Sequence, residues 1–238
     1  GSDAALETAD VALMGDDHTA ESSTTAHQSE YHFVDVMIPI LNPAGVQEIV
    51  DYGLYGFAMS RYCGTWAALK CMHETVESTG VIDGNLERVR IVTPDDFAMP
   101  DGGLNIRLND TILGQEARLY DYKRDAMLAF IRANKLNRII TSGGSNPKIG
   151  IVTTGKAYLD VRQALDELGI DEVRCNELGL RILKIGCPWP IPWTPPGAAG
   201  GRRSGAGGPA SPPSATAARR LRCGRGGQGP APTGRRSG

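Results

Sequence analysis

The sequence predicts an α/β protein with parallel sheets, and three observations support this prediction. Short apolar runs bounded by polar turn residues, at 11–14 and 148–154, are typical of buried strands. Apolar residues recur every three or four positions in 46–57 and 116–134, as expected for helices that pack by one face. The order strand, helix, strand over 148–185, with tight turns, favours parallel pairing.

The first half of the chain is expected to hold three elements after its first strand. Ser and Thr residues at 22–25 are good helix caps, so we expect a helix over 26–33. Pro39 interrupts the apolar run that follows, which predicts a short strand or an edge strand. The next helix opens at Asn42-Pro43, and Gly53 and Gly56 within it suggest close packing.

The middle of the chain is less regular. The run 65–72 is compatible with a helix or a buried strand, and 89–93 predicts a short strand. Prolines and glycines indicate a loop over 94–109 and a linker over 142–147. In the last unit we expect strands at 148–154 and 182–185, with a helix over 157–168 that ends at Gly169.

Composition changes abruptly near Pro188. The segment 189–238 has 12 Gly, 9 Pro and eight Arg, without Lys, Asp or Glu, so it predicts a disordered tail of charge +8. The remaining 17 basic and 27 acidic residues give the body a net charge of −10, unlike a nucleic-acid-binding domain. A natural arm and a frameshifted reading of a GC-rich gene both explain the tail, and we favour the frameshift; the coding DNA would decide. The start at Gly1-Ser2 rather than Met also suggests a piece of a longer protein.

The five cysteines form no C-x-x-C pair, which argues against a disulfide framework or a four-cysteine cluster. Buried, reduced thiols in a cytoplasmic protein are the expectation. No run reaches the roughly 18 apolar residues of a membrane helix.

A polar loop after the first strand is the candidate site, because loops at strand ends in parallel sheets are usual ligand positions. The candidate cofactor-proximal or substrate-proximal residues are Asp16, Asp17, His18, Ser22, Ser23, Thr24 and His27. The alternative is a loop that only caps its helix. We expect no metal site, because His27 and His32 are five residues apart instead of the four that align two ligands on a helix.

Three other features are expected to have a structural role and not a functional one. Residues 150–157 nearly fit a phosphate loop, but Ala157 has no hydroxyl for Mg²⁺, so we expect a strand-to-helix turn. Arg61 and Lys70 could pair with a substrate carboxylate or with acidic residues at the surface. We expect the surface pairing. The aromatic residues Tyr52, Tyr55, Phe57 and Trp66 are expected in the core.

Long runs of the sequence, in the same order, carry a family resemblance. They are 15–31 (GDDHTAESSTTAHQSEY), 38–48 (IPILNPAGVQE), 51–56 (DYGLYG), Ser60-Arg61, Leu69-Lys70, 75–78 (TVES) and 150–165 (GIVTTGKAYLDVRQAL). Over about 10–188 the chain resembles the fused indolepyruvate type of 2-oxoacid:ferredoxin oxidoreductase. The resemblance implies a partial pyrimidine-binding domain for thiamine diphosphate at 1–142. It also implies a truncated domain similar to the C-terminal domain of transketolase at 143–188, followed by the tail at 189–238.

The resemblance also implies an activity and its cofactors. The family oxidatively decarboxylates 2-oxoacids, aryl pyruvates such as indolepyruvate in this branch, with thiamine diphosphate, Mg²⁺ and [4Fe-4S] clusters. Electrons pass to ferredoxin and the acyl group passes to coenzyme A; a homo-oligomer is expected, without nucleic acid or membrane. The diphosphate and cluster motifs are missing here, so we expect this chain to bind no cofactor tightly and to be inactive alone, and no catalytic residue is assigned. The alternative is a non-catalytic α/β scaffold or subunit-interface module.

Overall fold

The computed structural model describes residues 9–21, 23–107 and 109–191, and for Leu86 the backbone only. The described residues belong to one compact unit. The expected tail lies outside the described residues apart from its first three positions, and so do Ser22 and Cys223.

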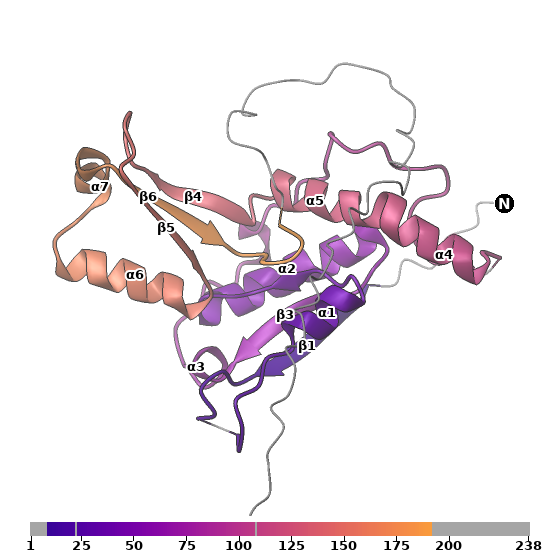
Figure 1. The fold of residues 1–238 in the computed structure, drawn as a ribbon, viewed down its shortest axis with the longest axis horizontal. Helices are drawn as coiled ribbons and strands as arrows, with labels where there is room; N and C mark the ends of the chain where they lie inside the picture. The colour runs from indigo at the N-terminus through magenta and orange to yellow at the C-terminus, as the bar shows by residue number, and fades with distance from the viewer. Residues whose placement is uncertain (1–8, 22, 108, 192–238) are drawn as a thin grey trace, which may run out of the picture. The chain divides into compact units, whose positions relative to one another are not determined.

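The first sheet has three parallel strands. They are β1 (Val11–Asp16), β2 (Ile40–Leu41) and β3 (Ala67–Met72), in the order β1-β3-β2. The run around Pro39 therefore gives a strand that is both short and at an edge. Helix α2 (Val46–Cys63) packs beside β3, and Gly56 permits this, because a Cβ there would crowd Val11 at 3.1 Å (Figure 1). No such crowding exists at Gly53, so the packing interpretation is wrong for that residue.

The second sheet is mixed. Its strands are β4 (Asn137–Ser142), β5 (Ile149–Thr154) and β6 (Leu180–Ile185), in the order β4-β6-β5. The expected parallel pairing of β5 with β6 is confirmed, whereas β4 runs antiparallel to β6 and was not expected. Helices α6 (Lys156–Glu167) and α7 (Glu172–Leu178) connect β5 to β6.

The remaining elements are helical. They are α1 (Glu30–Asp35), α3 (His73–Val76), the 3₁₀ turn η1 (Leu86–Arg88), α4 (Ile112–Arg118), the π-helical η2 (Leu119–Lys123) and α5 (Arg124–Ala133). Figure 1 shows α4 and α5 as one continuous helix, in agreement with the helix expected over 116–134. No helix in the described ranges is long and apolar enough to span a membrane.

Two expected elements are corrected. Residues 89–93 form no strand; the side chain of Asn134 accepts from the Val92 amide at 2.8 Å and donates to the Val92 carbonyl oxygen at 2.9 Å in place of a strand partner. The first helix begins at Glu30, not near 26, because Asp17 and His27 form an antiparallel bridge that keeps the preceding segment extended.

A core and two backbone hydrogen bonds join the sheets. Helices α2 and α5 bury Met59, Phe130 and Ile131 together with Cys187 of the chain after β6. At the β2 edge, the Ile40 amide donates to the Trp189 carbonyl and the Asn42 amide donates to the Gly186 carbonyl, both at 2.8 Å. Of the aromatic residues expected in the core, Tyr52 is buried and Tyr55 is partly buried, whereas Phe57 and Trp66 are exposed.

Candidate functional site

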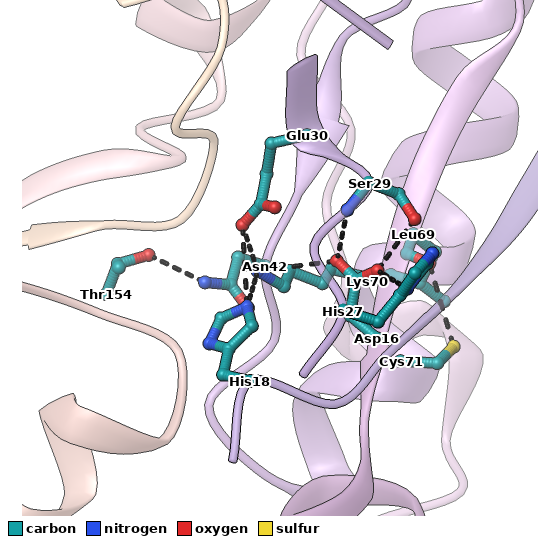
Figure 2. A network of polar contacts seen from close by, with 10 residues as sticks. All are labelled: Asp16, His18, His27, Ser29, Glu30, Asn42, Leu69, Lys70, Cys71 and Thr154. Carbon is teal, nitrogen blue, oxygen red and sulfur yellow. Dashed lines mark hydrogen bonds and ion pairs between the residues drawn. The ribbon is translucent and has the colours of Figure 1, made fainter. Parts of the chain in front are cut away.

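The carboxyl ends of β1 and β3 lie side by side, because Asp16 is the register partner of Met72. Six polar residues gather there, and we call them the buried-lysine cluster: Asp16, His18, His27, Ser29, Glu30 and Lys70. Figure 2 shows their side chains converging from β1, the following loop, the start of α1 and β3.

Lys70 is the centre of the cluster. It occupies β3 between buried neighbours, and only 2% of its side chain is exposed. Its ammonium lies 3.6 Å from Asp16 Oδ2, pairs with Glu30 Oε1 and donates to His18 Nε2 at 2.8 Å. A buried ammonium needs such compensation, because the interior solvates charge poorly. The expectation that Lys70 pairs with surface acids is therefore wrong.

Asp16 carries the matching negative charge, and its side chain is fully buried. Its carboxylate accepts from the Ser29 hydroxyl at 2.7 Å and from the Ser29 amide at 3.1 Å. His27 Nδ1 lies 3.1 Å from the same carboxylate. These contacts fix the loop after β1 onto the sheet and explain why Ser29, beside α1, caps no amide of that helix.

His18 is the most accessible member that touches Lys70, with 36% of its side chain exposed. Because the ammonium donates to Nε2, that nitrogen acts as an acceptor and the proton of neutral imidazole resides on Nδ1. One oxygen of Glu30, Oε2, is buried and accepts no hydrogen bond from a described residue. The cluster thus contains a proton-exchanging group and an unused acceptor.

A pocket of about 310 Å³ opens beside the cluster. It is lined by Gly15, Asp16, Asp17, Ser23, His27, Cys71, His73, Val76 and Glu77. Burial raises the pKa of the Cys71 thiol, partly offset by a hydrogen bond from the Met14 backbone, so Cys71 is not a ready thiolate nucleophile. The lining contains three carboxylates and neither lysine nor arginine, and the pocket therefore favours cationic or hydrogen-bond-donating ligands.

A metal ion does not fit the cluster as it stands. One ligand atom from each of Asp16, His18 and Glu30 lies within 4.8 Å of the others. The Lys70 ammonium, however, contacts all three side chains and supplies the positive charge that a metal would bring. A cation would have to displace a buried lysine, which makes these residues an ion-pair network and not a vacant coordination sphere.

The candidate residues from the sequence divide into two groups. Asp16, His18 and His27 meet in the cluster, whereas Asp17 and Ser23 line the pocket. Asp17 also organises the loop, since its carboxylate accepts from the Glu21 amide at 3.1 Å. Thr24 is exposed and Ser23 donates to the Thr25 carbonyl.

Three members of the cluster, Ser29, Glu30 and Lys70, were not among the sequence candidates. The available signal for Lys70 was a lone charge inside the apolar run Ala67–Met72, where a buried lysine requires an acidic partner. The rejected phosphate loop is a turn, as expected: Lys156 leaves it to pair with Asp160 at 2.7 Å on α6.

The chain is similar to known indolepyruvate oxidoreductases. A family model described as an indolepyruvate oxidoreductase domain matches residues 139–195. The chain is 26% identical over 184 residues to indolepyruvate oxidoreductase subunit IorA of Methanothermobacter thermautotrophicus, covering 76% of this chain and 28% of that protein. It is 26% identical over 191 residues to IorA of Pyrococcus horikoshii, covering 77% and 27%.

The chain therefore spans less than a third of the length of these curated relatives. The matches to these relatives cover about three quarters of this chain, and the domain match covers the second sheet from within β4 onward. The α/β fold agrees with these comparisons, and the chain is similar to indolepyruvate oxidoreductases of the IorA type.

Proposed function

We propose that the chain is part of an enzyme that oxidatively decarboxylates aryl pyruvates such as indolepyruvate with thiamine diphosphate. Ferredoxin accepts the electrons and coenzyme A accepts the acyl group. The observation that carries the proposal is the polar cluster and its pocket at the carboxyl end of a parallel sheet, in a chain related to IorA. In such sheets, ligands bind at the ends of the strands.

The lining of the pocket fits one part of thiamine diphosphate and not the other. Asp16, Asp17 and Glu77 supply carboxylates, which suit a cationic thiazolium and an amino-bearing ring. The same carboxylates repel a diphosphate, and the nearby Lys70 is already paired. The diphosphate and Mg²⁺ would therefore be held by residues outside this chain. When bound, the cofactor supplies the electron sink for loss of carbon dioxide.

The residues of this chain have three tasks in the proposed enzyme. Lys70 and Ser29 fix the Asp16 carboxylate, so one wall of the pocket is rigid and negative. His18 lies at the edge of the cluster with a proton on Nδ1, ready to exchange it with a ligand or water. Cys71 and Val76 give the pocket an apolar side that excludes water from bound aromatic groups.

The first test measures cofactor binding by the 238-residue chain alone. Thiamine diphosphate and Mg²⁺ should show no tight binding in a calorimetric titration, because no lysine or arginine lines the pocket beside the buried-lysine cluster. Tight, Mg²⁺-dependent binding would contradict the assignment of the diphosphate to another segment.

The second test uses the longer protein encoded around this chain. It should reduce ferredoxin when supplied with indolepyruvate, coenzyme A and thiamine diphosphate. His18→Ala and His27→Ala should each lower turnover, with the exposed His32→Ala as the matched control. Unchanged turnover in both variants would remove these histidines from the mechanism.

A non-catalytic interface module is the second candidate, and one observation favours it. Helix α4 exposes Ile112 and Leu113, at 87% and 75%, and the adjoining η2 exposes Tyr120. A module of this kind would assemble through α4 and make no contribution to turnover. In the longer protein, Leu113→Glu should then abolish assembly while the histidine variants retain full activity; the enzyme proposal predicts the reverse for the histidines.

A further inference from the structure

A second, basic pocket lies between α2 and the start of β4. Its volume is about 210 Å³, smaller than the ~300 Å³ or more of pockets for drug-sized ligands. It shares no residue with the buried-lysine cluster. The lining residues that matter are Asp51, Tyr52, Tyr55, Arg88, Lys135 and Arg138.

The acidic side chains of this pocket are already satisfied. Arg88 grips Asp51 with both terminal nitrogens, and Gln47 donates to the same carboxylate at 3.1 Å. Burial alone would raise the pKa of Asp51, but these hydrogen bonds and the Arg88 charge outweigh it and leave the pKa below its usual value. Glu48 pairs with the buried Lys184 and accepts from the Ala44 amide. Neither carboxylate is therefore available to neutralise further cations.

Two cations in the pocket remain unpaired. The side chains of Lys135 and Arg138 form no hydrogen bond or ion pair with any residue that the structure describes. Together with Arg88 and Lys184 they make four positive charges against the three negative charges of Glu48, Asp51 and Asp83, whose carboxylate lies 3.8 Å from Arg88 Nε. The surplus of positive charge favours an anionic ligand.

Lys135 stands where the backbone favours glycine. It has φ +51°, and it follows the C-cap of α5 in a Schellman motif: its amide donates to the Arg132 carbonyl and the Leu136 amide donates to the Ile131 carbonyl. The left-handed conformation is unfavourable for a residue with a Cβ. The Schellman motif therefore does not depend on the side chain of Lys135, and this side chain can be removed without loss of the fold.

The tyrosines add hydrogen-bond donors. Tyr52 is 7% exposed, and its hydroxyl makes no hydrogen bond with another described residue. Burial raises the pKa of Tyr52 and of Tyr55, so both phenols keep their protons. The Tyr52 hydroxyl is therefore free to donate to an acceptor in the pocket, beside the two unpaired cations.

We propose that this pocket binds the phosphoryl group of a small phosphate ester, with Arg138 as the principal anchor and Lys135 as a second charge. The planar guanidinium of arginine matches two phosphate oxygens at once, and such charge-assisted pairs are stronger than neutral hydrogen bonds. The volume of about 210 Å³ accommodates the phosphoryl group with a small attached group, and the ring of Tyr55 offers an apolar surface to that group.

The test uses the 238-residue chain with inorganic phosphate and phenyl phosphate as probes, titrated by calorimetry at constant ionic strength. Both probes should bind saturably, and Arg138→Ala should weaken the affinity at least tenfold. The matched control is Arg162→Ala, an exposed arginine of α6, which should leave the affinity unchanged.

Lys135→Gly separates the binding role from the fold. Glycine relieves the left-handed conformation, so this variant should melt at the same or a higher temperature while it binds phosphate several-fold more weakly. This variant keeps the proposal testable even if Arg138→Ala does not fold. The proposal is wrong if neither probe binds saturably, or if the control arginine variant loses as much affinity as Arg138→Ala. Because no thiamine diphosphate is present, these outcomes leave the proposed enzyme activity untouched.

Discussion

Replacing Lys70 by methionine tests whether the buried-lysine cluster is the ion-pair network described above. Methionine keeps the length and apolar stem of lysine and removes the ammonium. Asp16 then keeps its hydrogen bonds from Ser29 but loses the ion pair with the ammonium of Lys70. Water cannot replace that ammonium, because the Asp16 side chain is fully buried. Glu30 is 29% exposed, so its carboxylate can turn to water at little cost.

The magnitude follows from this asymmetry. Breaking a buried ion pair by removing one partner typically costs about 3–5 kcal/mol. The retained Ser29 contacts and the exposure of Glu30 place Lys70→Met near the lower limit, about 3 kcal/mol. Single domains are stable by about 5–15 kcal/mol, so the variant should fold but unfold at a much lower denaturant concentration.

The assay is urea unfolding of the 238-residue chain, followed by circular dichroism. Asp16→Asn and the double variant Lys70→Met with Asp16→Asn complete a cycle, and the double variant should be more stable than the sum of the single losses predicts. Lys156→Met, which removes an exposed pair with Asp160, is the control and should barely move the midpoint. A loss below about 1 kcal/mol for Lys70→Met, or strict additivity in the cycle, would refute the network.

Two further predictions concern the junction between the sheets. Gly186→Ala places a methyl group inside contact distance of the Tyr52 hydroxyl and the Leu136 carbonyl, so it should lower the free energy of unfolding by about 2 kcal/mol. Gly150→Ala is the control and should cost nothing, because no atom lies within 4 Å of the added methyl group. Equal urea midpoints for the two variants would contradict the crowding at Gly186. Burial raises the pKa of the Cys187 thiol from 9.0 to about 12, and the folded state therefore retains a proton that the unfolded state releases between these values. The contribution of this thiol to the free energy of unfolding should therefore fall by about 1.4 kcal/mol for each pH unit above 9. Cys187→Ala should thus be less stable than the parent at pH 7 and lose that disadvantage by pH 10.5; a pH-independent difference would show that the thiol titrates normally.

Sequence patterns identified the elements whose partners lie nearby. β5, α6 and β6 follow one another along the chain, and their pattern predicted both the elements and their parallel pairing. The run 89–93 is richer in β-branched residues than 137–142, yet only the second forms a strand. The difference is tertiary, because β4 finds an edge at β6 whereas Val92 meets only the side chain of Asn134.

The candidate site shows the same division. Asp16, His18 and His27 were found because they lie at the end of one strand or in the single loop that follows it. Lys70 lies 52 residues from His18 and 40 from Glu30, and no local pattern links those positions. The basic pocket combines three segments and was not anticipated, since its charges are unremarkable until the carboxylates beside them are seen to be paired.

The bridge between Ile40 and Trp189 has a consequence for the order of events during synthesis. The outer edge of β2 receives its backbone partners from a segment made roughly 150 residues later. Until that segment leaves the ribosome, the backbone N–H and C=O groups on the outer edge of the two-residue strand β2 lack these partners. We expect the nascent first sheet to stay open to chaperones or to stray strands through most of translation, and to become resistant to protease only when residues 186–189 arrive.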